Sequence, residues 1–165
     1  MLNKKTLIQL YFSFAYPYLI YGNILWGSAA ASTLWHLFKI QKNIIRIIGN
    51  IKRRDLTHNE FKKLKILRIP EIFQYSAAIF MHKYENNKLP PCFTNLFNYN
   101  KDIHSYNTRN QNKLRQPRIK TKMAELFITN MGPNIWNALE GKFNRDTSLT
   151  VFKKNMIGLL SEKYE

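Results

Sequence analysis

Acidic side chains are scarce in this chain of 165 residues. The three aspartates, Asp55, Asp102 and Asp146, each stand about 45 residues apart, and no Asp or Glu occurs between Met1 and Arg54. Polymerases and nucleases that work through two metal ions need carboxylates that converge on both ions. The sequence therefore argues against metal-assisted chemistry on a polyanion, although it leaves open the binding of one.

Other catalytic patterns are missing as well. The single cysteine, Cys92, excludes an internal disulfide, and the four scattered histidines lack zinc-ligand spacing. We find no Gly-rich phosphate loop, serine elbow, HExxH or CxxC motif. A nucleophile pair of Cys92 and His104 is conceivable, but no residue near either supports it. We therefore predict no metal, no cofactor, no catalytic residue and no enzymatic activity for this chain alone.

Positive charge is what the chain has in excess. It carries 26 Lys and Arg against 10 Asp and Glu, a formal net charge of +16 and a pI near 10.0. With 45% hydrophobic residues it has enough apolar material for a packed core, unlike a disordered basic tail. This balance favours a polyanionic partner, nucleic acid first and an anionic membrane surface second. A merely soluble basic protein is the remaining alternative.

An uncharged run occupies residues 6–35 and is long enough to span a bilayer. It also contains Gln, Ser, Asn, Pro and Gly, which makes a membrane segment the less favoured interpretation. We predict a buried helix over about 5–26, kinked or broken at Pro17. A small membrane-anchored protein, with residues 6–35 as its apolar segment, stays open as an alternative. The predicted apolar face of the helix consists of Leu7, Leu10, Phe14, Tyr18, Tyr21 and Leu25.

Four further helices follow from periodicity and end signals. One covers about 33–48, and Gly49-Asn50 ends it. A capping box of Thr57 and Glu60, with a staple between Leu56 and Phe61, opens a short helix to about residue 67. Pro70-Glu71 opens a helix that ends at Asn86-Asn87. Gly132-Pro133 is expected to break the chain, and Asp146, Thr147 or Ser148 to cap a final helix. The predicted core face of 33–48 comprises Leu34, Leu37, Phe38, Ile44, Ile45 and Ile48.

These patterns predict a mainly α fold in three parts. Residues 1–97 form a helical domain, residues 98–122 a basic and partly extended arm or linker, and residues 123–165 a small C-terminal helical unit. In an extended arm, alternation would place Arg118, Lys120 and Lys122 on one side.

Clustered cations are the candidate binding residues. Ten positive charges lie between Lys39 and Arg68, opposed only by Asp55 and Glu60, and on one side they would form a track for phosphates. Solvated helix faces are the alternative interpretation. The candidates for phosphate contact are Lys39, Lys42, Arg46, Arg53, Arg54, Arg109, Lys120 and Lys122. Tyr106 is the candidate for base stacking, and Tyr21, Trp26, Trp136 and Phe152 are interpreted as core.

An ordered series of motifs resembles a known family. The series includes YPYLIYGNILWG at 16–27, Gln41-Lys42 with Arg46, Leu89-Pro90-Pro91 with Phe93, His104 with Tyr106-Asn107-Thr108-Arg109, Gly132-Pro133 with Trp136-Asn137, and Ser148-Leu149 with Phe152-Lys153-Lys154. From about Lys5 to Lys163, the chain resembles the C-terminal part of the reverse transcriptase polyprotein of non-LTR (LINE-type, jockey-like) retrotransposons.

The resemblance implies a helical, thumb-like domain and the segment after it, which grip template RNA and primer. The catalytic palm, with its Tyr-x-Asp-Asp loop, and the fingers would then lie upstream of Met1. RNA and DNA are the implied partners, together with those missing domains, and no membrane is expected. The implied location is cytoplasmic, nuclear or both, as for a retrotransposon ribonucleoprotein. A helical protein-binding module is a further alternative.

Overall fold

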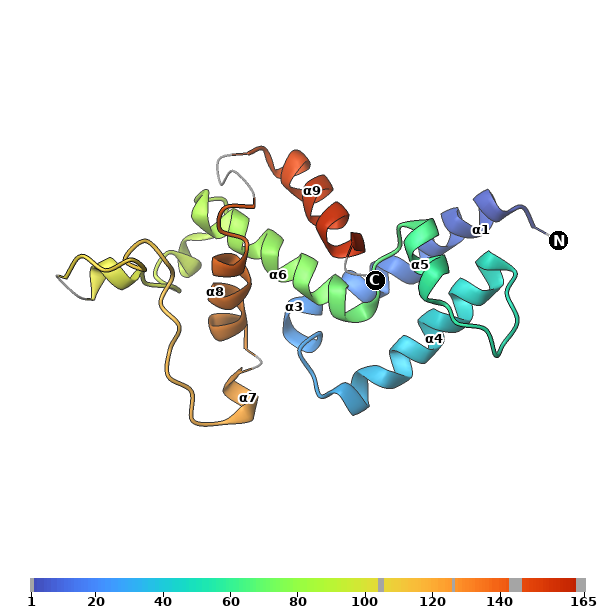
Figure 1. The fold of residues 1–165 in the computed structure, drawn as a ribbon, viewed down its shortest axis with the longest axis horizontal. Coiled ribbons are helices and arrows are strands. Elements are labelled where there is room, and N and C mark those ends of the chain that lie inside the picture. The colour runs from blue at the N-terminus through green and yellow to red at the C-terminus, as the bar shows by residue number, and fades with distance from the viewer. Residues whose placement is uncertain (1, 104–105, 126, 143–146, 163–165) are drawn as a thin grey trace. The chain divides into compact units, whose positions relative to one another are not determined.

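The computed structural model describes residues 2–103, 106–125, 127–142 and 147–162, except for the side chains of Lys122 and Met123. His104 and Asp146, named above, lie outside this part. The fold is mainly α, as predicted, and these residues form no extended strand (Figure 1). The helices are α1 (Lys4–Leu10), the π-helix η1 (Tyr11–Ala15), α2 (Tyr16–Ile20), α3 (Asn23–Trp26), α4 (Ala31–Gly49), α5 (His58–Leu64), α6 (Ile69–Glu85), the 3-10 helices η2 (Pro91–Phe93) and η3 (Asn100–Asp102), α7 (Lys122–Glu125), α8 (Ile128–Ala138) and α9 (Leu149–Glu162).

Backbone contacts divide the chain into two compact units. Unit 1 comprises Met1–Tyr75 and Met156–Glu165, and unit 2 comprises Ser76–Asn155. Helices α6 and α9 each contribute residues to both units. The predicted division at residues 97 and 122 was based on the composition of the sequence, whereas these two units are defined by contacts between backbone segments. The predicted division therefore stays a prediction.

The N-terminal helix of unit 1 is interrupted at a different place from the one predicted. The prediction of a helix over about 5–26 that is kinked or broken at Pro17 was wrong about the place of the break, because the chain leaves the helix at Tyr21 and turns at Gly22, whose φ is +59°. Pro17 lies in the first turn of α2. The wider π-helical turn before it, in which the Tyr16 N–H bonds to the Tyr11 carbonyl, accommodates a residue that has no N–H of its own.

The predicted apolar face of this segment is mostly exposed. Phe14, Tyr18, Tyr21 and Leu25 expose 68%, 81%, 84% and 85% of their surface, so the prediction that they are core was wrong. The neighbouring flank is buried instead. There Tyr11 joins a cluster with Ile45, Ile48, Phe61 and Ile66, against which Leu7, Ala15 and Leu19 pack.

Helices α4 and α5 supply the other side of this cluster. Ile45 and Ile48 are buried as predicted, whereas Leu37 is partly exposed. Asn50, in the left-handed conformation, ends α4 where the sequence placed its stop. Helix α5 also begins where predicted, at His58, but without the capping box.

The capping box fails because the backbone of Thr57 is already helical, and its side chain caps nothing. Glu60 pairs instead with Lys63 (2.9 Å) and Lys4 (3.8 Å). Leu56 is 87% exposed, so the predicted staple with Phe61 is also absent.

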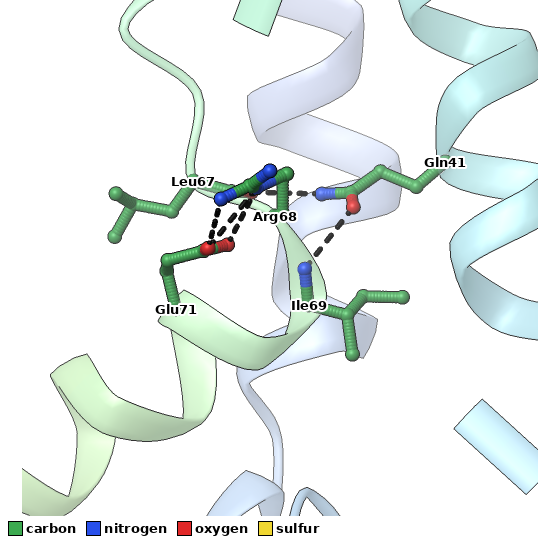
Figure 2. A network of polar contacts seen from close by, with 5 residues as sticks. All are labelled: Gln41, Leu67, Arg68, Ile69 and Glu71. Atoms are coloured by element: carbon green, nitrogen blue, oxygen red, sulfur yellow. Dashed lines mark hydrogen bonds and ion pairs between the residues drawn. The ribbon is translucent and has the colours of Figure 1, made fainter. Parts of the chain in front are cut away.

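A buried glutamine ties α4 to the start of α6 (Figure 2). Gln41 donates from Nε2 to the carbonyl of Leu67 (2.9 Å) and to the hydroxyl of Tyr11 (3.0 Å). Its Oε1 accepts the N–H of Ile69 (3.2 Å), the first residue of α6. One side chain thus satisfies a helix N-terminus and the carbonyl before it, both of which are buried.

In unit 2, the segments of α6, α8 and α9 enclose a ring cluster around His82. The imidazole stacks on Phe152 (4.4 Å between ring centroids), and its Nε2 lies 3.0 Å from the Thr147 carbonyl. Trp136 and Phe152 are buried, which confirms their prediction as core. Burial lowers the pKa of His82, and nearby Lys88 adds to this, while the bond to Thr147 opposes it.

The predicted break at Gly132-Pro133 was wrong, because both residues lie inside α8. A Cβ on Gly132 would lie 2.7 Å from the sulfur of Met81, so the glycine permits close packing of α8 on α6. Pro133 costs the helix one backbone hydrogen bond without ending it. The last helix is capped as predicted, by the Ser148 hydroxyl, which accepts the Val151 N–H at 3.4 Å.

The basic segment 98–122 is anchored rather than uniformly extended. An isolated antiparallel bridge joins Tyr99 to Leu114, and the Arg115 N–H donates to the Asn98 carbonyl (2.8 Å). The Asn137 amide bonds both the carbonyl (2.9 Å) and the N–H (3.1 Å) of Leu114, which is 1% exposed. The part after this clamp, residues 115–121, lacks regular structure.

Candidate nucleic-acid interface

The candidate cations of unit 1 begin on one face of α4. Lys39, Lys42 and Arg46 stand at i, i+3 and i+7, so the helix places them on the same side. Lys39 is exposed, and the other two are half-buried. The ammonium of Lys42 lies over the rings of Phe38 and Trp35, 4.3 Å and 5.0 Å from their centroids. The Arg46 guanidinium donates to Asn43 Oδ1 at 3.1 Å.

Two more candidates, Arg53 and Arg54, lie in the loop between α4 and α5. Both side chains are exposed. The Asp55 carboxylate accepts the Lys52 N–H (3.2 Å), and the Asp55 N–H donates to the Lys52 carbonyl (3.1 Å). These two bonds close a turn that carries both arginines, with its one acid turned to the backbone.

The acids of residues 2–75 are all engaged. Besides Asp55 they are Glu60, which binds Lys4 and Lys63, and Glu71, which binds Arg68 through Nε (3.0 Å) and through the terminal nitrogen (2.5 Å). Among the described residues, no ion pair reaches Lys39, Lys42, Arg46, Arg53 or Arg54. The positive charge of this surface is therefore uncompensated within the part of the chain that the structure describes.

The candidates from the basic segment belong to unit 2. Tyr106 is 78% exposed, and Arg109 is exposed in the turn beside it. Lys120 is exposed in the irregular stretch that precedes α7. The backbone of Lys122 begins α7, and its side chain lies outside the described residues.

The structure thus brings Lys39, Lys42 and Arg46 together and continues α4 directly into the loop of Arg53 and Arg54. Trp35 was not among the predicted site residues, although it stands on the face of Lys39 and Lys42. Its spacing of four and seven residues from them could have identified it. Tyr21 and Trp26, predicted as core, also differ from each other: Tyr21 is exposed, and Trp26 is partly buried, with its Nε1–H on the Tyr21 carbonyl (2.7 Å).

Burial displaces the pKa values of three tyrosines in unit 1. In the core of unit 1, burial raises the pKa of Tyr11 and of Tyr75. Burial, reinforced by the phenols of Tyr75 and Tyr11, raises the pKa of Tyr16 to about 12. Within the described residues, no three His, Cys, Asp or Glu side chains gather as metal ligands. None of the described helices is long and apolar enough to traverse a bilayer.

Comparisons with known protein families, with curated proteins and with solved structures found no match.

Proposed function

We propose that this chain binds single-stranded RNA and DNA through their phosphates, as a C-terminal part of a retrotransposon reverse transcriptase. In this role it grips template and primer, and it has no polymerase activity without the palm and fingers. The family assignment rests on the ordered motifs of the sequence. The binding role is supported by one observation above all, the set of exposed and half-buried cations in unit 1 with which no carboxylate of the described residues forms an ion pair.

Charge supports nucleic acid over a small anion. Each of the two units holds 13 Lys and Arg against five Asp and Glu. The candidates in unit 1 are also spread along a helix face and the loop after it, over the 16 residues from Lys39 to Arg54. Such a distribution suits a chain of phosphates, whose binding is driven by the release of condensed counterions.

Binding is tested by the anisotropy of a fluorescent oligouridylate titrated with the full chain over a series of salt concentrations. The logarithm of the affinity should fall with the logarithm of salt, with a slope of about −0.7 for each phosphate neutralised. Affinity that does not change with salt, or no binding at any salt, would refute the proposal.

A double charge reversal locates the contacts. R53E/R54E should weaken binding for every base sequence and flatten the slope by about 1.4, the share of two phosphates. K88E/K142E makes the same change of charge at two exposed lysines outside the predicted set. Equal losses in the two variants would show that only net charge matters, and the assignment of Arg53 and Arg54 would fall.

A further inference from the structure

Trp35 is an exposed indole on the cationic face of α4. It exposes 54% of its surface, and Lys39, Lys42 and Arg46 follow it at i+4, i+7 and i+11. The ammonium of Lys42 lies 5.0 Å from the centroid of the indole. Because residues 1–54 contain no acid, this cation and its neighbour Lys39 have no carboxylate partner on their own helix.

The indole is held in place from the core outward. Phe61 is buried and lies 6.2 Å from Phe38 between centroids, and Phe38 in turn meets Trp35 edge-on at 6.3 Å. Trp35 is thus the outermost of three rings that lead from the core to the surface. A ring that is anchored on one edge and about half exposed loses little freedom when a flat ligand stacks on it.

We propose that Trp35 stacks on a base of single-stranded nucleic acid while Lys39 and Lys42 hold the adjoining phosphates. The inference rests on the proposed function and adds to it a contact with bases. Aromatic rings beside a cationic track are the usual means of holding a single strand, and every base offers a face for stacking. The contact therefore tolerates any base sequence but requires that bases be present.

The test compares two probes with the same phosphates. One is a labelled oligothymidylate of about 12 nucleotides, and the other is an abasic strand of equal length. The unmodified full chain should bind the oligothymidylate about 5- to 100-fold more tightly than the abasic strand. W35A should lose this preference and keep its affinity for the abasic strand, whereas W35F should lose only part of it. The matched control is I47A, which truncates another exposed apolar residue of α4 (62% exposed) and should behave like the unmodified chain.

Tryptophan fluorescence gives a second measurement. Stacking on Trp35 should quench the tryptophan emission of the unmodified chain. The emission of W35F should stay unquenched, since Trp26 is partly buried and Trp136 is buried. Equal binding of both probes, with W35A like the unmodified chain, would overturn stacking and leave phosphate binding intact. Failure of the unmodified chain to bind either probe would overturn both proposals.

Discussion

Substituting Gln41 by alanine tests whether one buried amide holds α4, α6 and the N-terminal helix together. The side chain is 1% exposed and makes three hydrogen bonds, to Tyr11, Leu67 and Ile69. Its removal leaves a carbonyl and an N–H without partners in a place that water does not reach. Figure 2 shows how these two groups face the amide, one from Leu67 before α6 and one from Ile69, the first residue of α6.

The expected loss follows from the orphaned groups. Each buried polar group that loses its partner costs about 1–3 kcal/mol, so the two backbone groups together cost about 2–6 kcal/mol. Ile69 is 0% exposed and Leu67 is 5% exposed, which leaves little room for a replacing water. Alanine also leaves a small cavity, which adds to the cost. We expect Q41A to lower the free energy of unfolding by about 3 kcal/mol.

Urea denaturation of the full chain, followed by circular dichroism, measures this loss of unfolding free energy. Q41M separates the hydrogen bonds from the packing, because methionine fills the space without replacing the bonds; we expect it to lose nearly as much as Q41A. The exposed neighbour Asn43 provides the control N43A, which should change stability by less than about 0.5 kcal/mol. A loss below about 1 kcal/mol in both Gln41 variants would refute the role assigned to these bonds.

Two further predictions concern stability at high pH and the anchoring of the basic segment 98–122. Folding raises the pKa of Tyr16 from near 10 to about 12, so the stabilisation from its neutral phenol is present below pH 10 and is lost as the pH rises toward 12. Relative to Y16F, the unmodified chain should therefore lose about 2 kcal/mol of unfolding free energy over this interval. Below pH 9 the difference between the two chains should stay constant. N137A removes both bonds to the Leu114 backbone and should speed hydrogen exchange of the Leu114 amide at least about tenfold, while N134A, elsewhere on α8, should not.

The sequence predicted most helices and several of their ends, because these depend on local chemistry. Asn50 and Ser148 act through bonds to residues within one turn, and Pro70, whose ring fixes φ, lies with Glu71 in the first turn of α6. The predicted capping box is absent. The backbone of Thr57 is already helical, and Glu60 pairs with Lys63 and with Lys4, the latter more than fifty positions earlier.

Periodicity identified the N-terminal helix but not the flank that it buries. The helix is apolar over most of its circumference, so a face shifted by one residue along the chain is almost as apolar as the predicted one. Tyr11 decides the choice, since its hydroxyl bonds Gln41 on a different helix, and Gln41 reads as polar in the pattern of α4. Long-range pairs of this kind carry no local signal.

The scarcity of acids has a consequence for stability as well as for binding. Uncompensated cations repel one another and destabilise the compact state. In residues 2–75, Glu60 and Glu71 hold Lys4, Lys63 and Arg68, whereas Asp55 bonds the backbone of its own loop. No ion pair among the described residues reaches the candidate cations on the face of α4 and in the loop after it. A polyanion that binds there relieves the repulsion, and it stabilises the fold as far as it binds the folded chain more tightly than the unfolded one. The few carboxylates thus secure the helices, and the partner supplies the negative charge that the remaining surface lacks.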